Sequence, residues 1–155
     1  MVKLATELMG KPPVVKSLVT KYGYHKGGTI ALDNNIFKNP YFAGAILGHE
    51  VGHLVDWLPE MTMKRGNLLG RLLVLQSFLK NTFDGIMVTN KEIREELKDL
   101  TRWWNPFEEG ENPAYTKYRY SSRELYAEAL SVLLNEPEQM KEFAPEFNKL
   151  FWDNI

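Results

Sequence analysis

The chain has 155 residues, enough for one domain with a buried core, and 44% of them are hydrophobic. Its formal net charge is −1 and its basic residues are scattered, which argues against general binding to nucleic acid or to an anionic membrane. It has no cysteine, so disulfides and thiolate zinc sites are excluded, and a zinc ion would have to be bound by histidine and carboxylate side chains.

No signal peptide or membrane anchor is visible in the sequence. The N-terminal residues lack the apolar run of a signal peptide. The longest apolar stretch, Leu68 to Leu79, contains polar residues and is too short to span a bilayer. We therefore expect a cytoplasmic protein without membrane contact. The abrupt start leaves open that the chain is a piece of a longer polyprotein and that it is secreted with that parent protein. The sequence indicates no oligomeric state.

The first part of the chain predicts short elements followed by one longer helix. In order, these are a short helix ended by Lys11-Pro12-Pro13, an ambiguous β-rich segment at 14–19, a turn at 22–28, a strand at Thr29, Ile30, Ala31 and Leu32, and a helix from Pro40 to about Leu58. Pro59 is expected to end that helix.

The rest of the chain predicts helices joined by one long loop. In order, these are a leucine-rich amphipathic helix at 67–80, a helix from Asn90 to about Trp104, a loop at 107–116, a helix at 123–135 and a short helix at 145–152. Ser121 or Ser122 can cap the helix at 123–135. Together these elements predict one α+β domain spanning 1–155, mostly helical with a small sheet.

The most informative motif is His49-Glu50-Val51-Gly52-His53, which has the pattern H-E-x-x-H. Residues four apart share one face of a helix, so His49 and His53 can bind one Zn²⁺ per chain, with Glu50 beside them as a base for water. The surrounding helix is apolar nearly all round and should be buried. Buried polar side chains need a partner, which a metal would supply.

A third ligand is expected from the helix at 123–135. Its polar residues form a narrow stripe of Glu124, Glu128, Ser131 and Asn135 on an otherwise apolar helix. One interpretation is the solvated face of a surface helix, but such faces usually cover nearer half of the helix. The stripe therefore favours Glu124 or Glu128 as the third ligand, with water in the fourth position of a catalytic zinc site.

The two motifs together resemble those of the gluzincin zinc metallopeptidases. They are most similar to the anthrax lethal factor-like catalytic domains, whose motifs read H-E-x-G-H-x-x-D and E-F-x-A-E-A-F. The matching segments here are His49-Glu50-Val51-Gly52-His53-Leu54-Val55-Asp56 and Glu124-Leu125-Tyr126-Ala127-Glu128-Ala129. The segment at 64–71 resembles zincin-like domains of phage and mobile-element polyproteins. This resemblance implies a zincin-like fold built around an active-site helix.

The resemblance also implies a role for individual side chains. Glu124 matches the ligand glutamate, and Glu128 matches a residue that orients a histidine ligand by accepting its other N–H. Asp56 matches the aspartate that follows the second histidine. A tyrosine that steadies the oxyanion comes shortly before the third ligand in these enzymes, and Tyr118 and Tyr120 are the candidates, neither at the usual offset.

The function implied is a zinc-dependent endopeptidase with Glu50 as general base and a peptide or protein substrate. The strand Thr29-Ile30-Ala31-Leu32 precedes the motif helix, as the edge strand does in this fold, and an extended substrate would pair with it. An ordinary sheet strand is the alternative. His25, the only other histidine, would help to bind substrate or would simply be solvated.

Two other functions are weighed against this one. The first is a non-catalytic zincin-like binding or structural module of a phage or mobile-element protein, although a purely structural site has no use for the base Glu50. The second is a metal-free helical interaction module in which the motif occurs by chance. The metal content of the purified protein separates this metal-free module from both the endopeptidase and the non-catalytic zincin.

Overall fold

The computed structural model describes residues 1–62 and 90–153, with the backbone alone at 56–62 and at 90. The elements are α1 (Val2–Met9), β1 (Val14–Lys16), β2 (Gly23–Lys26), β3 (Thr29–Asp33), the 3₁₀ helix η1 (Asn34–Lys38), α2 (Pro40–Thr62), α4 (Asn90–Trp104), α5 (Pro113–Arg119), α6 (Ser122–Asn135), α7 (Pro137–Phe143) and α8 (Pro145–Asp153). The predicted class, α+β and mostly helical with a small sheet, is confirmed. The helix predicted at 67–80 lies outside the described residues.

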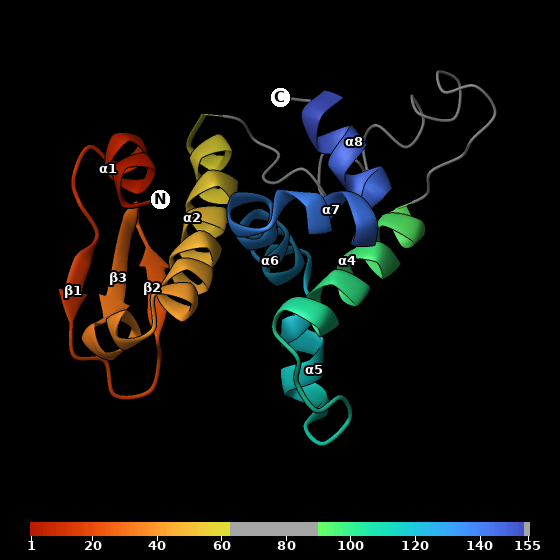
Figure 1. Ribbon diagram of the computed structural model, residues 1–155, viewed down its shortest axis with the longest axis horizontal. Coiled ribbons are helices and arrows are strands. Elements are labelled where there is room, and N and C mark those ends of the chain that lie inside the picture. Colours follow the sequence, from red (N-terminus) through yellow and green to blue (C-terminus); the bar gives the residue numbers. More distant parts are fainter. Residues whose placement is uncertain (63–89, 154–155) are drawn as a thin grey trace.

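Helix α2 stands between two groups of elements. The sheet and α1 lie on one side of it, and α4 to α8 lie on the other (Figure 1). A buried cluster fills each side. The first joins α2 to α1, β3 and η1 through Ala5, Ile30, Leu32, Ile36, Ala43, Leu47, Val51 and Leu54. The second joins α4, α6, α7 and α8 through residues that include Ile93, Leu97, Leu100, Leu125, Met140 and Phe147.

The strand order is β1-β3-β2, with β1 parallel and β2 antiparallel to β3. The turn between β2 and β3 needs only Gly27 and Gly28, whose φ values of 53° and 68° are those of a tight hairpin turn. The prediction of a turn over 22–28 was therefore too long. Four of those residues, Gly23–Lys26, pair with β3 instead.

The prediction that Thr29, Ile30, Ala31 and Leu32 form the edge strand was wrong. Ala31 pairs with Val14 of β1 on one side and with Tyr24 of β2 on the other, so both backbone edges of β3 are occupied. A substrate could not pair there. Among the described strands, β2 is the edge strand nearest to α2 (Figure 1).

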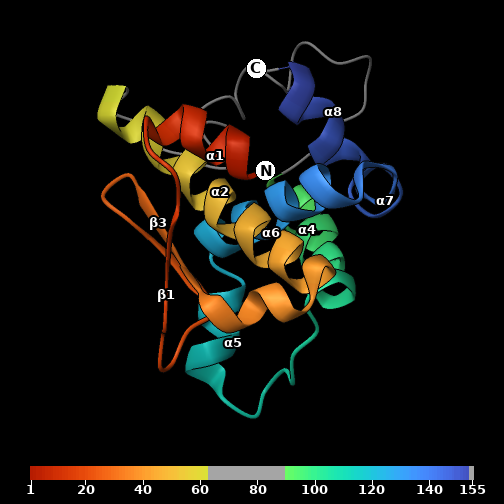
Figure 2. The same ribbon diagram turned by 60° about the vertical axis from the view of Figure 1, so that its left-hand side comes forward.

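Three glycines at four-residue spacing bring α6 close to α2 (Figures 1 and 2). A Cβ atom added to Gly52 would lie 2.7 Å from the Cα atom of Ala127, and one added to Gly48 would lie 3.1 Å from the Cα atom of Ser131. A Cβ atom at Gly44 would lie 2.8 Å from Oδ1 of Asn135. The two backbones therefore approach within a distance that larger residues would prevent.

Helix termini explain the remaining differences from prediction. Ser121 caps α6 as expected, by accepting from the Glu124 amide. The expected loop at 107–116 ends early because Asn112 caps α5 and Pro113 occupies its first turn. The predicted end of the long helix at Pro59 was wrong, because α2 runs to Thr62. The fixed φ of a proline is compatible with a helix, and only one backbone hydrogen bond is lost. In the described parts of the chain, no helix has the length and apolar character needed to cross a membrane.

Candidate metal centre

Two histidines of α2 and one glutamate of α6 converge at the contact between these helices. The Nε2 atom of His49 lies 3.4 Å from Oε2 of Glu124, and the Nε2 atom of His53 lies 3.4 Å from Oε1. One nitrogen of each ring and a Glu124 oxygen all lie within 4.8 Å of one another. The rings are nearly perpendicular, with centroids 4.6 Å apart. The predicted ligand set is thus brought together at one point.

The spacing of these atoms fits a zinc ion. Bonds of about 2.0–2.2 Å in a tetrahedral arrangement place neighbouring ligand atoms roughly 3.4 Å apart. Charge-assisted N–H···O hydrogen bonds are shorter, at about 2.7–2.9 Å. The separations of 3.4 Å, from each ring to a different oxygen of Glu124, are closer to the former. Two imidazoles and one carboxylate are also the donor set that a catalytic zinc site uses.

The cluster is buried and strongly coupled. Burial alone would lower the pKa of His49, but interactions with the nearby Glu124 and Glu128 carboxylates outweigh it and raise the pKa to about 10. Burial, together with the charge on His49, lowers the pKa of His53 to about 3. Burial works against ionisation of Glu124, yet His49 and His53 hold its pKa below the usual value. Without a metal, the cluster therefore keeps one proton on His49, where a cation would replace it.

Glu50 lies beside the cluster, and its burial and its pKa are those expected of a general base. It is only 6% exposed, and burial raises its pKa to about 7. Its Oε2 atom is buried and has no hydrogen-bond partner among the described residues. A Cβ atom on Gly23 of β2 would lie 3.1 Å from the Glu50 side chain, so the edge strand contacts this carboxylate directly. A pKa near neutrality suits a group that takes up and releases a proton.

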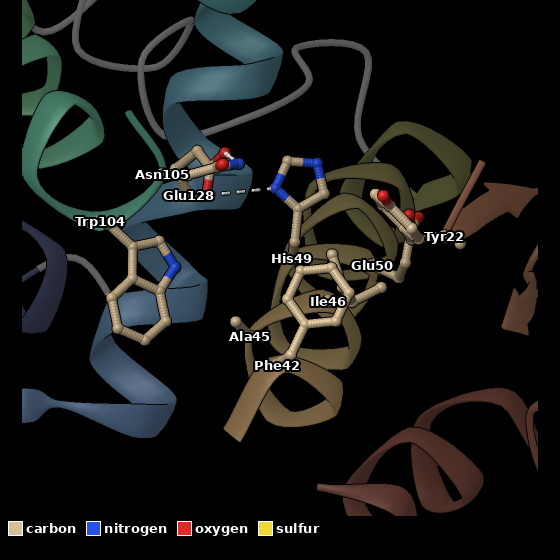
Figure 3. A pocket seen from close by; sticks show the side chains of 10 residues that line it. Tyr22, Phe42, Ala45, Ile46, His49, Glu50, Trp104, Asn105 and Glu128 are labelled. Atoms are coloured by element: carbon tan, nitrogen blue, oxygen red, sulfur yellow. Dashed lines mark hydrogen bonds and ion pairs between the residues drawn. The ribbon is translucent and has the colours of Figure 1, made fainter. Parts of the chain in front are cut away.

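Glu128 lies on the other side of the His49 ring. Its Oε2 atom is 3.5 Å from Nδ1 of His49, as the dashed line in Figure 3 marks. Its Oε1 atom accepts from Nδ2 of Asn105 at 2.9 Å and from Nη2 of Arg119 at 3.1 Å. Glu128 thus faces the ring nitrogen that the predicted histidine-orienting role involves. Sequence reasoning missed Asn105 and Arg119, although a buried carboxylate on an apolar helix signals a need for a cation.

The two candidate tyrosines differ in position. The Tyr118 hydroxyl interacts with Glu124, and burial together with the Glu124 charge raises the pKa of Tyr118 well above its usual value. Tyr120 instead donates to Glu109 and packs beside Arg102. The structure therefore brings Tyr118, and not Tyr120, to the cluster. The Asp56 side chain lies outside the described residues.

His25 is the remaining candidate, and the structure places it in β2 rather than in a turn. It is half-buried, and its charge acts on the pKa of His53. Burial and the nearby Arg123 lower the pKa of His25 itself. His25 thus belongs to the surroundings of the cluster, on the side of the edge strand.

A cavity of about 220 Å³ opens next to His49 and Glu50. Trp104 lies across the cavity from Phe42 and His49, and Tyr22 borders it near Glu50 (Figure 3). The other lining residues are Gly23, Ala45, Ile46, Asn105 and Glu128. The indole of Trp104 donates to Ser131, which fixes this wall. The cluster therefore borders a space large enough for a side chain or a small ligand.

Comparison with models of known protein families found no match, and neither did comparisons with curated proteins and with solved structures. The side chains at the contact of α2 and α6 are thus the basis for a functional inference.

Proposed function

We propose that the protein is a zinc-dependent endopeptidase of the gluzincin type with a zincin-like fold. One observation carries the proposal. Nitrogen atoms of His49 and His53 and a carboxylate oxygen of Glu124 converge at the spacing of a zinc site, with the buried carboxylate of Glu50 beside them. Structural zinc sites are usually closed by four protein ligands, whereas three ligands leave a position for water. The base also favours a catalytic site over a purely structural one.

Bound Zn²⁺ would polarise the scissile carbonyl and lower the pKa of the attacking water. Glu50 takes a proton from this water as its oxygen bonds to the carbonyl carbon. It then gives the proton to the leaving nitrogen as the C–N bond breaks. The Tyr118 hydroxyl, which lies beside Glu124, donates to the oxyanion that forms on the carbonyl. His49 and His53 act as neutral ligands throughout.

The substrate would bind along β2. An extended peptide can pair with the edge of a sheet, and Gly23 brings the β2 edge strand against Glu50. The residue that carries the leaving nitrogen would then lie nearest to Glu50 and the adjoining cavity. An engineered cavity of about 150 Å³ accommodates benzene. The cavity of about 220 Å³, with Tyr22, Phe42 and Trp104 in its walls, therefore suits a bulky apolar side chain.

The decisive experiment compares the wild type with Glu50→Gln in zinc content and in cleavage of a diverse peptide library. Both proteins should hold one zinc per chain by native mass spectrometry. Cleavage by the variant should fall by roughly 100- to 10,000-fold, the usual contribution of a general base. Glu138→Gln, at an exposed glutamate of α7, is the control and should leave both properties unchanged. Equal inactivity of wild type and Glu50→Gln would contradict the proposal.

A further inference from the structure

Arg119 is a buried cation next to the candidate metal centre. It is the last residue of α5 and only 6% exposed. Arginine is rarely buried to this extent unless it has a partner. Its Nη2 atom donates to Oε1 of Glu128 at 3.1 Å and to the backbone oxygen of Asn105 at 2.9 Å. Its guanidinium group also lies over the ring of Phe107, 4.6 Å from the centroid. Arg119 is therefore held in one place from several directions.

This guanidinium is connected to His49 through a single carboxylate. Arg119 and the Asn105 side chain bind Oε1 of Glu128, and Oε2 of the same group faces Nδ1 of His49 at 3.5 Å. A carboxylate is planar, so partners that hold one oxygen also set the direction of the other. The contacts thus run from α5 through α6 to α2 and end on the ring nitrogen that faces away from Glu124.

We propose that Arg119 is a positioning residue of the metal centre. By donating to one oxygen of Glu128, it fixes the orientation of that carboxylate, which keeps the proton of neutral His49 on Nδ1 and leaves Nε2 free to bind the cation. Without Arg119, the buried Glu128 carboxylate would lose the charged partner that holds it, and a carboxylate that turns away no longer orients the ring. This inference deepens the proposed function and rests on it, because it assigns Nε2 of His49 to zinc.

The first test measures the zinc affinity of the full chain by competition with a chromophoric chelator. Arg119→Met should weaken affinity by about 10- to 100-fold, the usual effect of losing a partner of a metal ligand. Arg119→Lys should restore part of this loss, because it returns the charge. Arg94→Met is the matched control, since Arg94 bonds Ser122 and the Tyr120 backbone near the start of α6 without touching Glu128.

A double substitution separates positioning from general support of the fold. Arg119→Met/Glu128→Gln removes both charges and leaves no buried ion unpaired. If Arg119 acts through Glu128, the double variant should bind zinc no more weakly than Glu128→Gln alone. An additive loss in the double variant would overturn the inference. So would a loss in Arg94→Met as large as that in Arg119→Met.

A spectroscopic measurement examines His49 itself. In ¹H–¹⁵N correlation spectra of the zinc-bound wild type, His49 should give a protected Nδ1–H signal. In Arg119→Met this signal should broaden or vanish, while the ring signals of His53 stay in place. An unchanged Nδ1–H signal and wild-type zinc affinity in Arg119→Met would overturn the positioning role alone. Failure of the wild type to bind zinc would instead overturn the proposed function, and this inference with it.

Discussion

The two sides of α2 around His49 are built in opposite ways. Toward α6 the backbones approach closely at Gly52, and the hydroxyl of Ser131 donates to the carbonyl of Ala45 at 2.8 Å. Beside this contact, the same helix borders a cavity of about 220 Å³ whose walls include Gly23 of β2, Trp104 at the end of α4 and Glu128 of α6. The closed side can hold ligands rigidly and the open side can admit a substrate. The proposed catalytic centre would need both properties, and His49 lies where the two regions meet.

The largest expected effect lies on the closed side, where Glu124 and Glu128 face opposite nitrogens of His49. Glu124→Ala should weaken zinc affinity by more than about 100-fold, because it removes a proposed ligand. Glu128→Ala should weaken it by about 10- to 100-fold, because it removes only an orienting group. Chelator competition measures both. A larger loss in Glu128→Ala would mean that the two carboxylates have exchanged roles.

The close approach of the helices is tested by Gly52→Ala. The added Cβ atom would lie 2.7 Å from the Ala127 backbone, which cannot move without separating α2 from α6. Overpacking of this kind costs about 1–3 kcal/mol, and each kcal/mol lowers Tm by roughly 2–4 °C in a chain of this size. Calorimetry should show this fall together with weaker zinc binding.

Gly44→Ala is the matched control on the same face of α2. Its Cβ atom would meet the movable end of the Asn135 side chain rather than backbone, at 2.8 Å. Alanine also favours a helix over glycine by roughly 1 kcal/mol, which offsets that contact. We expect a Tm within a few degrees of wild type. A fall in Tm as large as that of Gly52→Ala would show that the close approach of the two backbones at Gly52 has no special importance.

The closed side could be predicted from the sequence far better than the open side. Local signals identify α2 and α6, namely apolar periodicity and the Ser121 cap, and the i, i+4 rule aligns His49 with His53. The thin polar stripe of α6 indicated the buried Glu124. These features depend on residues close together in sequence.

The open side depends on contacts between distant segments. Strand β2 has only four residues, including a glycine and a lysine, so it gives no alternating signal. Which strand lies at the edge is a property of the folded sheet and not of any one strand. Arg119 lies in the sequence between Tyr118 and Tyr120, the two candidates for the oxyanion role. Only the packing of α5 against α6 reveals its contact with Glu128. Side-chain partners of this kind leave no periodic pattern.

A smaller effect should appear on the open side, where Ala45 lines the cavity. Ala45→Leu should fill part of the space and lower kcat/KM for peptides with a bulky residue after the scissile bond by about tenfold, within the range for a few methylenes. Zinc affinity and cleavage before small residues should stay unchanged. Ala114→Leu, at an exposed position of α5, is the control. Equal losses of kcat/KM for small and bulky residues would show that the cavity takes no part in substrate binding.

The smallest expected effect concerns the proton on His49, on the closed side, as distinct from the proposed base Glu50 on the open side. Without metal, the two carboxylates raise the pKa of His49 to about 10, so His49 is protonated at neutral pH and must lose that proton to bind zinc. Loss of the His49 proton alone should therefore raise zinc affinity with pH, by about tenfold per unit between pH 6 and 8. His53, whose pKa is lowered to about 3, adds nothing to this slope.

Calorimetry in buffers of different ionisation enthalpy measures that proton directly. We expect about one proton from His49 per zinc bound at pH 7 in the wild type, with a fraction of a second proton from Glu50, whose pKa is raised to about 7. Glu128→Gln should release fewer, because the loss of one carboxylate lowers the pKa of His49. Glu50→Gln changes a side chain on the open side and should still release the His49 proton. A zinc affinity that is independent of pH from 6 to 8 would mean that the closed side holds no proton, and that His49 is already free to bind the metal.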